Sequence, residues 1–156
     1  MAIAEKLFVS SAYWDDTIGI AAGIATLKEL QKREAVSHFL DVGSYFKSRI
    51  NEAASVANIS VRCCGTSAFP KIIFDIKNPM LLKKVETLFI QENARQGILL
   101  GGGIFLNLSY NSEIVDQTTE TVTNSFNIIS RALERENIDE VLEVPIQSES
   151  FRRIVE

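Results

Sequence analysis

The sequence of 156 residues has few of the side chains from which metal and redox sites are built. It contains two cysteines, Cys63 and Cys64, and a single histidine, His38. A structural zinc site needs about four such ligands, and no second cluster accompanies the adjacent cysteines. A disulfide between the two would be strained, because neighbouring strand residues point to opposite faces. We therefore expect no metal site, one buried thiol, one partly exposed thiol, and a histidine at the surface or at a helix end.

An excess of positive charge and a long apolar run are missing as well. The net charge is −4 and the pI is about 5.1, with 46% hydrophobic and 23% charged residues. No basic stripe with interleaved aromatic residues is present, so we expect no nucleic-acid partner. No apolar run is long enough to cross a bilayer, and the first residues lack the pattern of a signal peptide. The composition predicts a cytoplasmic globular protein without a membrane partner.

The chain also lacks the common catalytic motifs. Gly101-Gly102-Gly103 is not followed by the Lys-Ser/Thr of a phosphate loop, and neither G-x-G-x-x-G nor G-x-S-x-G occurs. The eight lysines lie on polar helix faces, at strand ends or in turns, without the apolar setting that a Schiff-base lysine needs. We predict no catalytic residue. The glycines read as a bend between two short strands, with a ligand loop over 97–110 as the alternative.

The first helix that the pattern predicts has an unusual composition. It is capped by Asp15 or Asp16 and runs to about Arg33, with an apolar face of Ile20, Ile24, Leu27 and Leu30. Its first half is rich in glycine and alanine, and each of its two glycines costs about 1 kcal/mol relative to alanine. Such small residues indicate close approach of another backbone or a ligand. Tight helix packing without a ligand is the simpler interpretation.

The rest of the chain predicts helices packed on a small sheet. Local signals include an Asn-Pro helix start at Asn78, a left-handed helix stop at Gly97 and a cap at Asn111. The expected elements are a helix with Val36 and Leu40 on its apolar face (about 36–57), two antiparallel strands (59–64 and 69–76), a helix (79–96), two short strands (97–110), a long helix (from 112) and a solvated acidic tail (from 134). Because the strands form hairpins, the predicted fold is α+β, a small mostly antiparallel sheet covered by helices and preceded by a long connecting helix.

Three stretches resemble a known enzyme family. VSSAYWDDTIGIAAGIATLKEL (9–30) resembles the segment just after the cofactor-lysine region of class III pyridoxal-phosphate (PLP) aminotransferases, closest to the glutamate-1-semialdehyde aminomutase-like branch. ETLFIQENARQGILLGGGIFLNLSYNSEIVDQTTETVTNSFNIISRAL (86–133) resembles the family's later helix, Gly-Ile/Val-Leu strand, polar turn and terminal helix. FRRI (151–154) resembles a family ending.

The resemblance implies a C-terminal domain of a fold-type I PLP enzyme. Residues 1–14 would be a remnant of a large-domain strand and subunit-boundary loop, 15–35 the connecting helix, and 36–156 the small domain. The family's cofactor lysine, aspartate and glycine-rich phosphate region lie upstream of the matched segment. PLP is therefore expected in the intact parent and not in this chain alone, which would not be catalytic. The expected partners are the missing large domain or a second copy in a dimer, and the alternative is a stand-alone oligomerisation or binding module derived from that domain.

The resemblance also singles out one short stretch for cofactor contact. In the family, a threonine in this stretch reaches the cofactor phosphate of the neighbouring subunit. That position is Ala12 here, which has no hydroxyl. Ser10 or Ser11 could donate to a phosphate oxygen instead, so these two serines are the predicted cofactor-binding residues.

Overall fold

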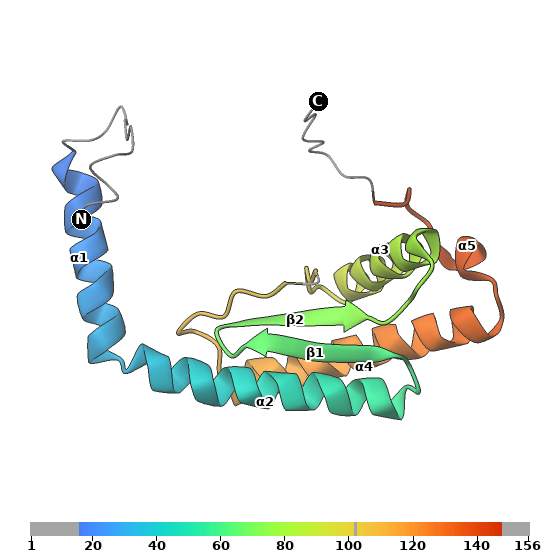
Figure 1. Ribbon diagram of the computed structural model, residues 1–156, viewed down its shortest axis with the longest axis horizontal. Helices are drawn as coiled ribbons and strands as arrows, with labels where there is room; N and C mark the ends of the chain where they lie inside the picture. Colours follow the sequence, from blue (N-terminus) through green and yellow to red (C-terminus); the bar gives the residue numbers. More distant parts are fainter. Residues whose placement is uncertain (1–15, 102, 148–156) are drawn as a thin grey trace. The chain divides into compact units, whose positions relative to one another are not determined.

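The computed structural model of the protein describes residues 16–101 and 103–147 (Figure 1). The chain divides into two compact units, with the boundary between Val36 and Ser37. The first unit contains helix α1 (Thr17–Lys32), and helix α2 (Ala35–Val56) begins at the boundary. The second unit contains most of α2 together with every later element.

Helix α1 forms as the sequence predicts. The carboxylate of Asp16 accepts a hydrogen bond from the Ile18 N–H at 2.9 Å, which confirms the predicted N-cap. None of its residues is buried, and Ile18 and Leu27 are 77% and 68% exposed. A Cβ added at Gly19 or Gly23 would meet no atom within 4 Å. The small residues of α1 therefore face open space in the described part of the chain.

Helix α2 supplies a wall of the core in the second unit. Its continuous buried face begins at Gly43, where a Cβ would lie 1.9 Å from the carbonyl oxygen of Ser67. Only glycine permits the helix to approach the hairpin turn this closely. Val36 and Leu40, which belong to the predicted apolar face, are 75% and 55% exposed because they precede this contact. That part of the prediction is wrong.

The sheet of the described residues is a single antiparallel hairpin, as predicted. Strands β1 (Val61–Thr66) and β2 (Phe69–Phe74) pair in the register Cys63↔Ile72, with Gly65 in the left-handed region at φ +92° next to the turn. Side chains alternate along β2, so that Ile72 and Phe74 are buried while Lys71 is exposed. On the opposite edge of β1, the Asn51 side chain accepts from the Cys63 N–H at 2.7 Å and donates to the Cys63 carbonyl at 3.1 Å.

Two helices pack beside the hairpin and complete the core (Figure 1). Helix α3 (Pro79–Arg95) is capped by Asn78, and helix α4 (Ser112–Glu134) by Asn111, both as predicted. Three buried rings join these elements: Phe89 stacks on Phe126 at 5.7 Å between centroids, and Phe74 meets both edge-on. Gly97 ends α3 in the left-handed region at φ +83°, as expected. The predicted fold class, α+β with helices over a small antiparallel sheet, is confirmed.

The segment after α3 does not contain the two strands that the sequence predicts. In residues 97–101 and 103–110 the only pairing is an isolated antiparallel bridge between Lys71 and Gly103. The Ile104 N–H donates to the Pro70 carbonyl at 3.1 Å, but Pro70 has no N–H to return. Glycine also disfavours extended pairing. The segment therefore follows the start of β2 without becoming a strand.

The described part of the chain ends in an acidic segment on the surface. The short helix α5 (Ile138–Val141) buries Ile138, and the acidic residues from Glu134 onward are exposed, as predicted. Asp139 nevertheless pairs with Lys84 of α3 at 2.6 Å. None of the helices in 16–101 and 103–147 is long and apolar enough to span a bilayer.

Candidate functional site

The residues predicted to contact a cofactor cannot be placed. Ser10, Ser11 and Ala12 lie outside the described residues, as do the whole of 1–14 and the FRRI motif at 151–154. Candidate sites in the described part of the chain are therefore built from other side chains.

A polar groove of about 680 Å³ lies between α2 and α4. The lining residues on α4 recur every three to four positions, which places their side chains on one face of the helix. The lining residues are Arg49, Ser112, Glu113, Asp116, Gln117, Thr119, Glu120, Thr123 and Asn124. One arginine faces three carboxylates, so the groove is negative and suits a polar or cationic group.

A hydrogen-bonded cluster at one side of the groove connects its two helices. Asp116 accepts from the Tyr45 hydroxyl at 2.7 Å and from Arg49 Nε at 3.2 Å, and Arg49 also pairs with Glu52 at 3.1 Å. The bond to Asp116, together with partial desolvation, raises the pKa of Tyr45. Neither a nucleophile beside a base nor a ligand set for a metal occurs here. In the described ranges, no three His, Cys, Asp or Glu side chains come together to hold a metal ion.

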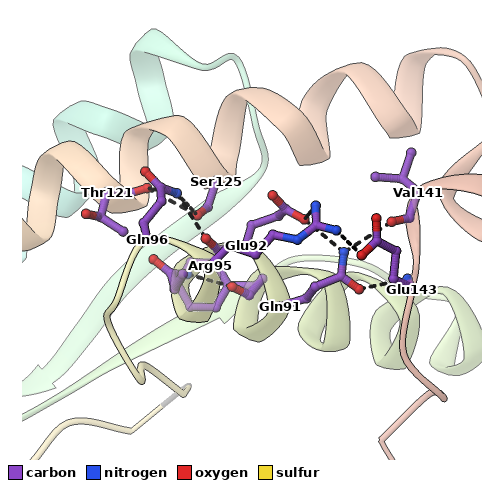
Figure 2. Close-up of polar contacts among 10 residues, drawn as sticks. Gln91, Glu92, Arg95, Gln96, Thr121, Ser125, Val141 and Glu143 are labelled. Atoms are coloured by element: carbon purple, nitrogen blue, oxygen red, sulfur yellow. Dashed lines mark hydrogen bonds and ion pairs between the residues drawn. The ribbon is translucent and has the colours of Figure 1, made fainter.

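A second polar cluster joins α3 to the segment after α5 (Figure 2). Gln91 donates to the Val141 carbonyl at 3.1 Å and accepts from the Glu143 N–H at 2.8 Å. Arg95 lies between two carboxylates: it contacts Glu92 at 2.9 Å and forms an ion pair with Glu143. The pKa of Glu143 is lowered by this contact with Arg95. Glu92 is only 4% exposed, so its partners satisfy a buried charge.

The same cluster continues from α3 onto α4. Gln96 donates to the backbone carbonyl of Glu92 at 3.0 Å and accepts from Asn124 at 3.0 Å, while its side chain lies 3.5 Å from Ser125 (Figure 2). The contacts connect α3 to α4 and to the segment after α5. Sequence reasoning missed this cluster, because its partners on different elements lie 25 to 52 residues apart and share no motif.

The two thiols differ as the sequence predicts. Cys63 is buried, and Cys64 is half-buried with Arg62 Nη1 at 3.7 Å from its sulfur. Burial, with a smaller contribution from Cys64, raises the pKa of Cys63 to about 12. Cys63 therefore stays protonated at neutral pH and is a core side chain rather than a nucleophile. His38 lies near the start of α2, half-buried, with its ring edge-on to Phe39 at 5.8 Å.

Comparisons with known proteins point to transaminases. No protein-family model matches the chain. The 3-aminobutyryl-CoA aminotransferase of Cloacimonas acidaminovorans (strain Evry) is 24% identical over 98 residues, which is 63% of this chain and 24% of that protein. The PLP internal aldimine form of the Sphingopyxis sp. MTA144 FumI protein matches 89% of this chain at a TM-score of 0.72 and 16% identity. A transaminase with PLP bound matches 81% of it at a TM-score of 0.67 and 15% identity.

These likenesses show the fold of part of a PLP transaminase. The chain spans 24% of the length of the curated relative and 34% and 30% of the two solved chains. It therefore corresponds to about a quarter to a third of each of these proteins.

Proposed function

We propose that this chain is the C-terminal portion of a class III PLP-dependent aminotransferase of the glutamate-1-semialdehyde aminomutase-like branch, and that it is not catalytic by itself. The observation that carries the proposal is the match in fold at a TM-score of 0.72 over 89% of this chain but only 34% of a PLP-bearing protein. The sequence match to an aminotransferase, found independently of the fold, supports it. Fold alone does not fix a function, so the sequence match matters.

In this proposal the chain has three parts. Residues 1–14 are the remnant of a large-domain strand and subunit-boundary loop, 15–35 are the connecting helix, and 36–156 are the small domain. The division of the structure into compact units between Val36 and Ser37 supports this organisation. The partner is then the large domain of the parent, which acts as a dimer in the cytoplasm.

The cofactor belongs to the parent. PLP, when bound there, supplies the electron sink for amino-group transfer. The part of this chain nearest to it would be Ser10 and Ser11, whose hydroxyls donate to the cofactor phosphate of the neighbouring subunit.

The setting of the lysines supports an inactive isolated chain. A lysine that forms a Schiff base is usually desolvated. Each lysine of the described ranges is exposed or half-buried; these are Lys28, Lys32, Lys47, Lys71, Lys77, Lys83 and Lys84. The half-buried Lys84 pairs with Asp139.

Borohydride trapping tests the proposal. The full chain is incubated with PLP and reduced, once folded and once unfolded in urea, and the adduct on each lysine is measured by peptide mass spectrometry. We expect low labelling spread over many lysines in both states. A stoichiometric adduct at one lysine, formed only by the folded chain, would contradict the proposal.

The second candidate is a stand-alone oligomerisation or binding module. It is favoured by the exposed apolar side chains of α1, among them Ile18 at 77%, Ile24 at 50% and Leu27 at 68%. Apolar faces of this kind usually mark an interaction site. Light scattering across a concentration series decides: this candidate requires self-association that Leu27→Ser abolishes, whereas a strict monomer argues for the first proposal.

A further inference from the structure

The last turns of α4 and the short helix α5 form a pocket of about 200 Å³, called here the arginine pocket. Helix α4 ends at Glu134. Glu136 then takes the left-handed conformation at φ +52°, and the Asn137 N–H donates to the Ala132 carbonyl at 3.1 Å. This helix stop turns the chain, so that α5 packs against α4. The lining residues are Ile128, Arg131, Ala132, Arg135, Asn137 and Val141.

Part of the arginine pocket is apolar. Ala132 is buried, and Ile128 and Val141 are half-buried. Small-molecule sites usually measure about 300–1,000 Å³, so a pocket of about 200 Å³ suits a molecule smaller than most ligands. Its apolar side chains can contact a short hydrocarbon chain and remove it from water.

Two guanidinium groups without a carboxylate partner border this apolar part. Arg131 and Arg135 are exposed and lie four residues apart, which places them on one face of α4. Among the residues that the structure describes, neither side chain forms an ion pair. Arg49, Arg62 and Arg95, by contrast, each pair with a carboxylate, at 3.1, 3.3 and 2.9 Å. Like charges at this spacing destabilise a helix, and an anion between them would relieve the repulsion.

The polar groups around the pocket favour a carboxylate as that anion. A guanidinium presents its N–H groups in a planar fork that matches the two oxygens of a carboxylate. The nearby Glu140 does not take this place, because it accepts from the Asn137 amide at 3.4 Å. The side-chain oxygen of Asn137 is buried and has no donor among the described residues. An unsatisfied polar atom thus adjoins two unpaired cations at one apolar surface.

We propose that the arginine pocket binds a small carboxylate with a short apolar chain. The carboxylate lies between Arg131 and Arg135, and the chain lies against Ile128, Ala132 and Val141. Inorganic phosphate would satisfy the arginines but would leave the apolar surface uncovered. The inference goes beyond the proposed function and does not depend on it, since it concerns only α4, α5 and the turn between them.

NMR titration of the full chain with butanoate tests the proposal. The observed signals are the Nε–Hε groups of Arg131 and Arg135 and the methyl groups of Ile128 and Val141. At constant ionic strength, butanoate should shift all four in a saturable way. Acetate should bind about tenfold more weakly, because it lacks two methylene groups that butanoate buries. Butanamide has the same chain without the charge and should not saturate the arginine signals.

Two variants and a matched control separate the pocket from general attraction of anions. Arg131→Gln and Arg135→Gln should each weaken butanoate binding about tenfold, because each removes one charge-assisted contact. The control Arg62→Gln removes an exposed arginine of β1 and should bind butanoate like the unchanged chain. All three positions are exposed, and the remaining signals of each spectrum report whether the variant is folded.

Three results would overturn the proposal. The first is a titration in which butanoate leaves the signals of Arg131 and Arg135 unmoved, or shifts them without saturation. The second is equal binding of butanoate and butanamide, because the arginines would then play no part. The third is unchanged butanoate affinity in the double variant Arg131→Gln/Arg135→Gln.

Discussion

Helices α1 and α4 begin in the same way but have different roles in the fold. Each starts with a side-chain cap, Asp16 or Asn111, and each carries apolar residues at helical spacing. Nine residues of α4 are buried, whereas none of α1 is. Local sequence therefore makes both helices, but only tertiary packing gives one of them a place in a core. A helical pattern therefore shows which face needs a partner and not where that partner lies.

The largest predicted effect is on the free energy of unfolding, and it distinguishes two isoleucines, one in each helix. Ile129 of α4 is fully buried and Ile24 of α1 is half exposed. Ile129→Ala should reduce the free energy of unfolding by about 2–5 kcal/mol, because it removes buried methyl groups and leaves a cavity. Ile24→Ala should change it by less than about 0.5 kcal/mol. Urea unfolding followed by fluorescence measures both, and equal losses would remove the contrast between the helices.

Two glycines give the next test. A Cβ at Gly43 of α2 would overlap the backbone of Ser67, while one at Gly23 of α1 meets nothing within 4 Å. Gly43→Ala should destabilise the domain by about 1–3 kcal/mol. Gly23→Ala should instead increase helicity, since alanine is favoured in a helix by about 1 kcal/mol. Circular dichroism with thermal unfolding reports on both. A loss of stability in Gly23→Ala would mean that α1 already packs closely in this chain.

The smallest effect concerns two ion pairs. Glu143 pairs with Arg95 across 48 residues, whereas Glu29 pairs with Lys32 within α1 at 3.9 Å. Arg95 lowers the pKa of Glu143 in the folded state. The stabilisation that this ion pair gives to the fold is therefore present above the unfolded pKa of about 4.3, and it is lost as the pH falls through the lower folded pKa.

Thermal unfolding from pH 2 to pH 7 measures this contribution. Glu143→Gln should have a lower Tm than the unchanged chain at pH 6, and the two should converge in acid. The control Glu29→Gln should track the unchanged chain at every pH. A Glu143→Gln curve parallel to that of the unchanged chain would show that the ion pair does not contribute.

The sequence predicted those elements whose signals are local. Asn78, Asn111 and Gly97 mark helix ends through their own hydrogen bonds and backbone angles, and the hairpin follows from two apolar runs around a short turn. The fold class followed from the order of these elements. Strand alternation predicted one buried and one partly exposed thiol, and the structure shows that these are Cys63 and Cys64.

The misses depend on contacts between distant residues. The glycine segment after α3 was expected to form strands, yet it meets β2 where Pro70 has no N–H to complete a ladder. The exposure of Leu40 depends on where Gly43 meets Ser67. The cluster of Gln91, Arg95 and Glu143 carries no motif, because its geometry exists only after α3 and the segment after α5 have packed together.

The intact mass of the native protein tests whether this chain is one part of a longer aminotransferase, as we propose. An antibody against residues 112–134 would capture the product from its source, and mass spectrometry would give its length. We predict a polypeptide roughly three times as long as this chain, as the 34% coverage of the FumI structure implies, with this sequence at its C-terminal end. A native product of 17.4 kDa would contradict the claim and would favour the stand-alone module.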